Sequence, residues 1–177
     1  HYFTMQLIEG KTLEQILARD PTTYTRRPRE AVQLLLPIVD ALAHAHFVGI
    51  IHRDLKPANI ILDAAGVPLL MDFGLAKDVV AGSKLTKTGM AVGTPSYMPP
   101  EQATGKQDLI DARSDGYSVG AILYEMLTGR PPFEGATLME TMEKVVRDDP
   151  VRPSRYNPDL PRDLETIIMK CLEKSQA

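Results

Sequence analysis

His52-Arg53-Asp54-Leu55-Lys56-Pro57-Ala58-Asn59 is the stretch of this chain that says most about its fold and its chemistry. It brings a carboxylate, an ammonium group and a carboxamide into one short run, where the three side chains can point at a single site for phosphate and a metal ion. Asp72-Phe73-Gly74 follows an apolar stretch and supplies a second carboxylate at an expected junction of strand and loop. Because Asp-Phe-Gly alone indicates no more than a turn, the chemistry is inferred from the two stretches together.

Length and composition are those of one globular domain. The chain has 177 residues, enough for a sizeable core. Its net charge of −3 argues against electrostatic binding to nucleic acid or to an anionic membrane. The single cysteine, Cys171, excludes an internal disulfide, and its apolar neighbours predict a buried thiol.

No apolar run is long enough to span a membrane. A cytoplasmic location is expected, a membrane anchor elsewhere in a longer parent protein is left open, and the oligomeric state is not indicated.

The spacing of apolar residues predicts a mainly helical chain with one small sheet, an α+β fold. A strand is expected at Tyr2 to Ile8, with a turn at Glu9-Gly10, and a β-hairpin at residues 60–62 and 67–71. Residues 77–93 show little periodicity and are expected to form a mobile loop. Helices are expected at Thr12 to Arg19, Arg29 to Phe47, Ser114 to Thr128, Leu138 to Arg147 and Leu160 to Lys174.

The helix expected at Ser114 to Thr128 differs from the others because it is apolar nearly all round. Such a helix belongs at the centre of a domain rather than on its surface. Gly129, followed by Pro131-Pro132, predicts where this helix ends.

Further motifs follow the first two in a characteristic order. They are Gly93-Thr94-Pro95-Ser96-Tyr97-Met98, Pro100-Glu101-Gln102, Arg113-Ser114-Asp115 and Tyr124-Glu125-Met126-Leu127-Thr128-Gly129. With them, the chain from Tyr2 to Lys174 resembles the large C-terminal lobe of serine/threonine protein kinases, and most of all the bacterial eukaryotic-like kinases. The resemblance implies transfer of the γ-phosphoryl group of ATP to serine and threonine hydroxyls of protein substrates, with Mg²⁺, or alternatively Mn²⁺, as the metal.

The resemblance is incomplete at both ends of the chain. No Gly-rich phosphate loop, Val-Ala-Ile-Lys strand or helix glutamate of the small lobe precedes residue 1, and no arginine partner for Glu101 follows Cys171-Leu172. Residues 1–177 are therefore expected to be a partial kinase domain, the hinge and the C-lobe, with little or no activity alone. Two positions also depart from the family pattern, namely Pro99 and Gly116.

The resemblance assigns four residues to the phosphoryl-transfer chemistry. It implies that Asp54 is the catalytic base and that Lys56 offsets the charge of the transferred phosphoryl group. Asn59 and Asp72 would hold the metal through oxygen ligands, which Mg²⁺ prefers. The alternatives are an Asp54 satisfied by backbone N–H groups, a solvated Lys56 and an Asn59 that caps a turn.

Nucleotide binding is assigned to the beginning of the chain and to the predicted hairpin. Met5-Gln6-Leu7-Ile8 resembles the hinge, with Met5 as gatekeeper and backbone groups of Gln6 and Ile8 contacting adenine. Ile61 would form the apolar floor under the base. An ordinary buried strand explains the same apolar residues.

A regulatory role is implied for the residues around the predicted loop. Arg53 would pair with a phosphate on Thr86 or Thr88, because charge-assisted hydrogen bonds from arginine can order a loop. Thr94 would bond the catalytic groups and shape the substrate groove. The alternative for Thr86 and Thr88 is that loops are rich in threonine.

Structural roles are implied for His52, Phe73 and Glu101. Asp115 is either an N-terminal helix cap or, as the resemblance implies, the residue that holds the backbone of the catalytic loop, and both can be true. A metal site formed by His44, His46 and His52 is rejected, because residues two apart on a helix face different directions.

Two other functions are left open. The first is a scaffold or binding module of the pseudokinase kind, which the missing small-lobe motifs favour and the intact set at residues 54, 56, 59 and 72 opposes. The second is a small-molecule phosphotransferase of kinase-like fold, although such enzymes usually lack a segment like Gly93-Thr94-Pro95.

Overall fold

The computed structural model describes residues 8–73 and 95–174. The strand predicted at residues 2–8 lies outside the described residues except for Ile8, and the loop predicted at residues 77–93 lies outside them entirely. The described part is mainly helical with a small antiparallel sheet, as the hydrophobic spacing predicts. The helices are α1 (Leu13–Arg19), α2 (Pro28–Phe47), α4 (Pro100–Ala103), α5 (Ala112–Thr128), α6 (Leu138–Arg147) and α7 (Arg162–Cys171).

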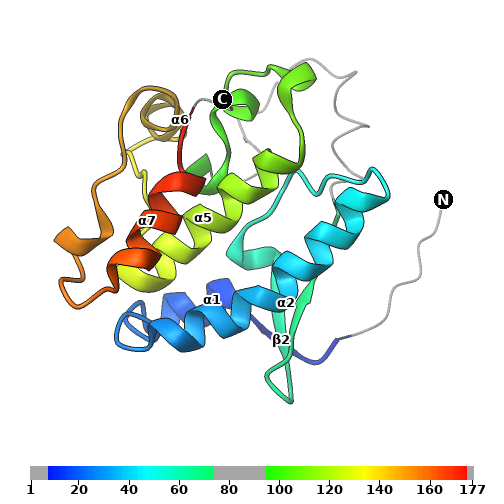
Figure 1. The fold of residues 1–177 in the computed structure, drawn as a ribbon, viewed down its shortest axis with the longest axis vertical. Coiled ribbons are helices and arrows are strands. Elements are labelled where there is room, and N and C mark those ends of the chain that lie inside the picture. The colour runs from blue at the N-terminus through cyan, green and yellow to red at the C-terminus, as the bar shows by residue number, and fades with distance from the viewer. Residues whose placement is uncertain (1–7, 74–94, 175–177) are drawn as a thin grey trace.

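Helix α5 lies in the middle of the molecule, with α7 packed on one side and α2 on the other (Figure 1). Its buried side chains include Ile122, Met126 and Leu127, none of which is exposed. The prediction of a central helix is therefore confirmed. The helix ends at Gly129, whose φ of 76° is left-handed and suits a residue without Cβ.

The start of α5 shows that one of the two roles considered for Asp115, that of N-terminal cap, is wrong. The N-cap is Asp111, whose side chain accepts a hydrogen bond from the backbone N–H of Arg113, while the Ser114 hydroxyl bonds back to the backbone N–H of Asp111. This reciprocal capping starts the helix at Ala112, two residues earlier than predicted. Asp115 is therefore not the cap, and its carboxylate is left for other contacts.

The sheet has three antiparallel strands in the order β1 (Gly10–Thr12), β2 (Ile60–Asp63) and β3 (Pro68–Leu70). The predicted hairpin is confirmed, and its turn is closed by the Asp63 carboxylate, which accepts hydrogen bonds from two backbone N–H groups. The turn predicted at Glu9-Gly10 is wrong, because Gly10 begins β1. A Cβ at residue 10 would overlap the backbone carbonyl of Leu62, so glycine permits the close approach of two strands here.

The last helix is shorter than predicted. It begins after Pro161 and ends at Cys171, before the Lys174 that the hydrophobic spacing included. The Lys174 ammonium group turns to α6, where it donates to the backbone carbonyls of Lys144 and Val145. A cation at the carboxyl end of a helix satisfies carbonyls that the helix itself cannot.

Short 3₁₀ segments connect the longer elements. They are η1 (Pro57–Asn59), η2 (Pro95–Tyr97), η3 (Gln107–Leu109) and η4 (Pro153–Arg155). Among the described helices, none combines the length and the apolar character needed to cross a bilayer.

Candidate active site

The structure brings together the three polar side chains of the run at residues 52–59. The Lys56 ammonium group lies 3.0 Å from Oδ2 of Asp54. The Asn59 amide nitrogen donates to the backbone carbonyl of Asp54 at 2.7 Å and lies 3.3 Å from the same Oδ2. One carboxylate oxygen thus meets an ammonium group and an amide, which together orient the side chain.

Local structure explains this convergence. Pro57 starts the 3₁₀ turn η1, which reverses the chain so that Asn59 lies beside Asp54. Ile60 follows and is completely buried as the first residue of β2, which anchors the turn in the core. Asn59 is itself buried, and its amide nitrogen is used in the contacts to Asp54, so its amide oxygen is the atom suited to a cation.

His52 connects this loop to the segment that carries Asp72. Its Nδ1 accepts a hydrogen bond from the backbone N–H of Asp54 at 3.3 Å, and its Nε2 lies 2.9 Å from the carbonyl of Met71. A backbone N–H can only donate and a carbonyl can only accept, so the ring carries its hydrogen on Nε2 and is neutral. The fully buried imidazole also packs on the Phe73 ring, with the ring centroids 4.9 Å apart.

Asp72 thus lies between two residues that contact the run at residues 52–59, Met71 and Phe73. Its neighbour Met71 also donates its backbone N–H to the carbonyl of Asn59 at 2.9 Å. Asp72 has a φ of 54°, which is unusual for a residue other than glycine, and its side chain is exposed. The structure thus places Asp72 in a segment bound directly to both ends of residues 52–59, the candidate catalytic run.

Asn59 and Asp72 offer oxygen ligands that fit Mg²⁺. A carboxylate and a carboxamide are hard ligands, and Mg²⁺ commonly takes only one or two protein groups, with water and phosphate oxygens completing its shell. One carboxylate and one carboxamide fit a metal that is shared with a phosphate. Within residues 8–73 and 95–174, no cluster of three or more His, Cys, Asp and Glu side chains is found.

Asp115 reaches the loop from α5. This carboxylate is 1% exposed, and it accepts the backbone N–H of His52 at 2.9 Å and that of Arg53 at 3.0 Å. His46 lies 2.7 Å from the same carboxylate through Nε2. The imidazole rings of His46 and His52 thus have separate partners, and His44 is exposed on α2.

The other candidate residues are placed as follows. Ile61 is half-buried in β2, opposite Thr12 and Leu69, and Ile8 is half-buried just before β1. Glu101 is buried and accepts the Ser114 hydroxyl at 2.5 Å. The remaining candidates fall outside the described residues: Met5, Gln6, Thr86, Thr88 and Thr94.

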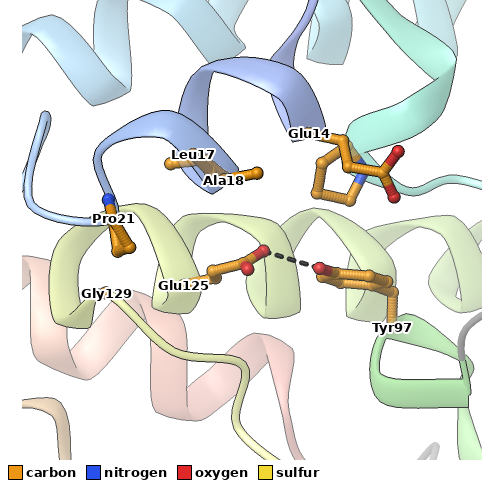
Figure 2. Close-up of a pocket in the computed structure, with 8 residues that line it drawn as sticks. Glu14, Leu17, Ala18, Pro21, Tyr97, Glu125 and Gly129 are labelled. Atoms are coloured by element: carbon orange, nitrogen blue, oxygen red, sulfur yellow. Dashed lines mark hydrogen bonds between the residues drawn. The ribbon is translucent and has the colours of Figure 1, made fainter.

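A hollow of about 280 Å³ lies between α1, α5 and the segment at residues 95–97 (Figure 2). Tyr97 donates its hydroxyl to the Glu125 carboxylate across it at 2.7 Å. Burial, and next the charge of Glu125, raise the pKa of Tyr97, so Tyr97 stays the donor. Burial also raises the pKa of Glu125, against the opposing effect of the Tyr97 hydrogen bond. Pro57 of the catalytic run lines the same hollow.

Sequence reasoning missed one contact to the catalytic run. The Gln102 side chain of α4 donates its amide N–H to the backbone carbonyl of Arg53 at 2.8 Å. In the sequence, Gln102 is the last residue of the Pro100-Glu101-Gln102 motif. Membership of that motif is the available signal, but glutamine is usually a surface residue.

Comparisons with known proteins agree with this geometry. The family model of the protein kinase domain matches residues 1–177. The chain is 40% identical over 174 residues to the serine/threonine-protein kinase PknB of Mycobacterium leprae and 41% identical over 176 residues to PknB of Mycobacterium tuberculosis, and each alignment covers 98% of this chain and 27% of the relative. A probable serine/threonine-protein kinase of Streptomyces coelicolor, SCO3848, is 38% identical over 174 residues, which are 98% of this chain and 25% of that protein. The chain thus spans about a quarter of the length of these curated relatives. On this match, the chain belongs to the protein kinase domain family.

Proposed function

We propose that this chain is the hinge and C-lobe part of a serine/threonine kinase domain, which transfers the γ-phosphoryl group of ATP to a hydroxyl of a protein substrate. The observation that carries the proposal is the Asp54 carboxylate held by Lys56 and Asn59. The same short run contacts Met71, the residue directly before Asp72, through His52 and Asn59. The relatives named above, called serine/threonine-protein kinases, support this reaction over others.

Asp54 is the proposed base. As the substrate oxygen bonds to the γ-phosphorus, its proton passes to the Asp54 carboxylate, while the bond from the γ-phosphorus to the bridging oxygen breaks and ADP leaves with the electron pair. The contacts of Lys56 and Asn59 with Oδ2 keep the carboxylate in one orientation. A base fixed in this way also directs the attacking hydroxyl.

Lys56, Asn59 and Asp72 are the proposed binders of the phosphate and metal. Lys56 lies beside Asp54, where its ammonium group can neutralise charge on the transferred group. Asn59 through its amide oxygen and Asp72 through its carboxylate would hold the metal. When bound, Mg²⁺ neutralises the negative charge that develops on the phosphate oxygens.

The decisive test is phosphate transfer from radiolabelled ATP to a serine- and threonine-containing protein such as casein, by the full natural reading frame that contains these residues. Asp54→Asn is expected to lower the rate by about a thousandfold, within the usual contribution of a general base. Asp40→Asn, an exposed carboxylate on α2, is the matched control and should retain the rate.

Two results would contradict the proposal. An Asp54→Asn protein with a rate within about tenfold of the unmodified protein would remove Asp54 as the base. Residues 1–177 expressed alone are expected to show little transfer, since the family needs groups of a small lobe to cradle the phosphates. A rate equal to that of the full reading frame would show that the lobe assignment is wrong.

A further inference from the structure

Arg53, the residue directly before the proposed base, has a left-handed backbone. Its φ is 64°, a region in which residues with a Cβ are sparsely found. A strained conformation of this kind persists only when its surroundings hold it. The peptide group between Arg53 and Asp54 follows directly. Its orientation, and with it the position of the Asp54 backbone, depends on how firmly Arg53 is held.

Two side chains hold the peptide groups on either side of the Arg53 Cα. Asp115 of α5 accepts the N–H of Arg53 at 3.0 Å, and Gln102 of α4 donates to its carbonyl at 2.8 Å. The second of these peptide groups also contains the N–H of Asp54, which donates to His52. With both flanking peptide planes bound, rotation about the φ and ψ of Arg53 is restricted.

The backbone position of Gln102 is fixed by its neighbour in the chain. Its neighbour Glu101 is buried and accepts the hydroxyl of Ser114, which directly precedes Asp115. Arg53, Gln102, Glu101, Ser114 and Asp115 therefore form a closed ring of hydrogen bonds and covalent links. Helix α4 and helix α5 thus hold the same residue from two directions.

We propose that Gln102 is a positioning residue for catalysis, whose amide sets the orientation of the Asp54 backbone by holding the carbonyl of Arg53. This inference rests on the proposed function, because it assumes that Asp54 is the base. It also connects α4, and the segment at residues 95–99 that leads into it, to the geometry of the base.

Two substitutions separate the lost hydrogen bond from other effects. Gln102→Met keeps the length of the side chain and removes the donor, while Gln102→Glu keeps the shape and turns a donor into an acceptor facing a carbonyl. Gln107→Glu is the matched control, since Gln107 is an exposed glutamine of η3 in the same region. Asp54→Asn is assayed beside them in the full natural reading frame.

Both Gln102 variants are expected to lower kcat by about 10- to 100-fold, since a small misplacement of a catalytic group costs about this much. The KM values for ATP and for the protein substrate should stay within about twofold, because Gln102 is proposed to orient a group and not to bind substrate. The second measurement is hydrogen exchange at the backbone amides of Arg53 and Asp54. Both amides should exchange faster in the variants, with little change in Tm, and Gln107→Glu should match the unmodified protein in every measurement.

The outcomes distinguish this inference from the proposed function. Unchanged kcat and unchanged amide exchange in the Gln102 variants, beside a large loss in Asp54→Asn, would overturn the role of Gln102 and leave the kinase proposal standing. A loss of kcat in Gln102→Glu but not in Gln102→Met would show that the new carboxylate is repelled near the buried Glu101. That result would also overturn the proposed role of Gln102. An active Asp54→Asn protein would instead contradict the proposed function, and amide exchange would still decide whether Gln102 holds the loop.

Discussion

At the scale of single residues, backbone strain and buried polar groups gather around the catalytic run. Among the described residues other than glycine, positive φ angles occur at Arg53 and Asp72. Each belongs to one of the two motifs that carry the proposed chemistry. Strain of this kind usually costs about 1–3 kcal/mol and is retained at functional sites. Two separate strained residues at one site therefore agree with a function that depends on the geometry there.

Tyr117 gives a prediction about a buried polar group. Its phenol is 4% exposed, and within the described part of the chain its hydroxyl has no hydrogen-bond partner. Tyr117→Phe removes that hydroxyl, so thermal unfolding should show stability that is unchanged or higher by up to about 1 kcal/mol.

Tyr124 on the same helix is the matched control. It is 1% exposed, but its hydroxyl donates to the carbonyl of Val151 at 2.8 Å. Tyr124→Phe loses this bond and should lower stability by about 1 kcal/mol. An equal loss in both variants would mean that the Tyr117 hydroxyl is satisfied after all.

At the scale of elements, alanine substitutions at the two glycines inside α5, Gly116 and Gly120, are predicted to have opposite effects on stability. A Cβ on Gly120 would overlap the Cβ of Cys171, because α5 and α7 approach closely there, whereas no described atom lies within 4 Å of the place a Cβ would take on Gly116. Gly120→Ala should lower stability by about 1–3 kcal/mol, as overpacking does. Gly116→Ala should raise it by about 1 kcal/mol, because alanine favours the helix.

The two alanine variants control for each other in chemical denaturation, since both add one methyl group to the same helix. A loss at Gly116 comparable to that at Gly120 would show that residue 116 is also closely packed. A gain at both would mean that α5 and α7 can separate at no cost.

At the scale of the whole molecule, Glu125 joins three parts of the fold, and it predicts how stability depends on pH. It lies on α5, accepts the Tyr97 hydroxyl and faces Glu14 of α1 across the hollow (Figure 2). Burial raises its pKa, and the charges of Glu14 and Glu134 add to the rise. The folded protein therefore binds this proton more tightly than the unfolded chain, so the contribution of Glu125 to stability falls as the pH rises from the unfolded pKa through the folded one.

Glu125→Gln removes this titration and should make the protein more stable relative to the unmodified chain at pH 7 than at pH 5. The measurement is Tm for both proteins at the two pH values. Glu9→Gln, a change at an exposed carboxylate, is the control and should shift Tm equally at both. An advantage of Glu125→Gln that is larger at pH 5 would show that the Tyr97 hydrogen bond to the ionised carboxylate outweighs the cost of burying its charge.

Much of this protein could be predicted because the relevant interactions are local in the chain. Asp54, Lys56 and Asn59 meet within six consecutive residues, and the spacing of apolar residues located α2, α5 and α6 to within a few residues. The prediction of a turn at Glu9-Gly10 was wrong because glycine is common both in turns and where two strands approach closely. Only the nearby carbonyl of Leu62, which the sequence does not show, distinguishes these two cases.

By itself, the sequence determined the family, the order of helices and hairpin, and the polar groups of the catalytic run, because each depends on neighbouring residues or on a regular period. Only the tertiary structure decided what holds that run. Asp115 and Gln102 meet Arg53 across 62 and 49 positions of the chain. An aspartate near a helix start and a glutamine in a short helix are equally suited to water or to a cap. Their function depends on how α4 and α5 pack against the loop, and a one-dimensional pattern carries no record of that packing.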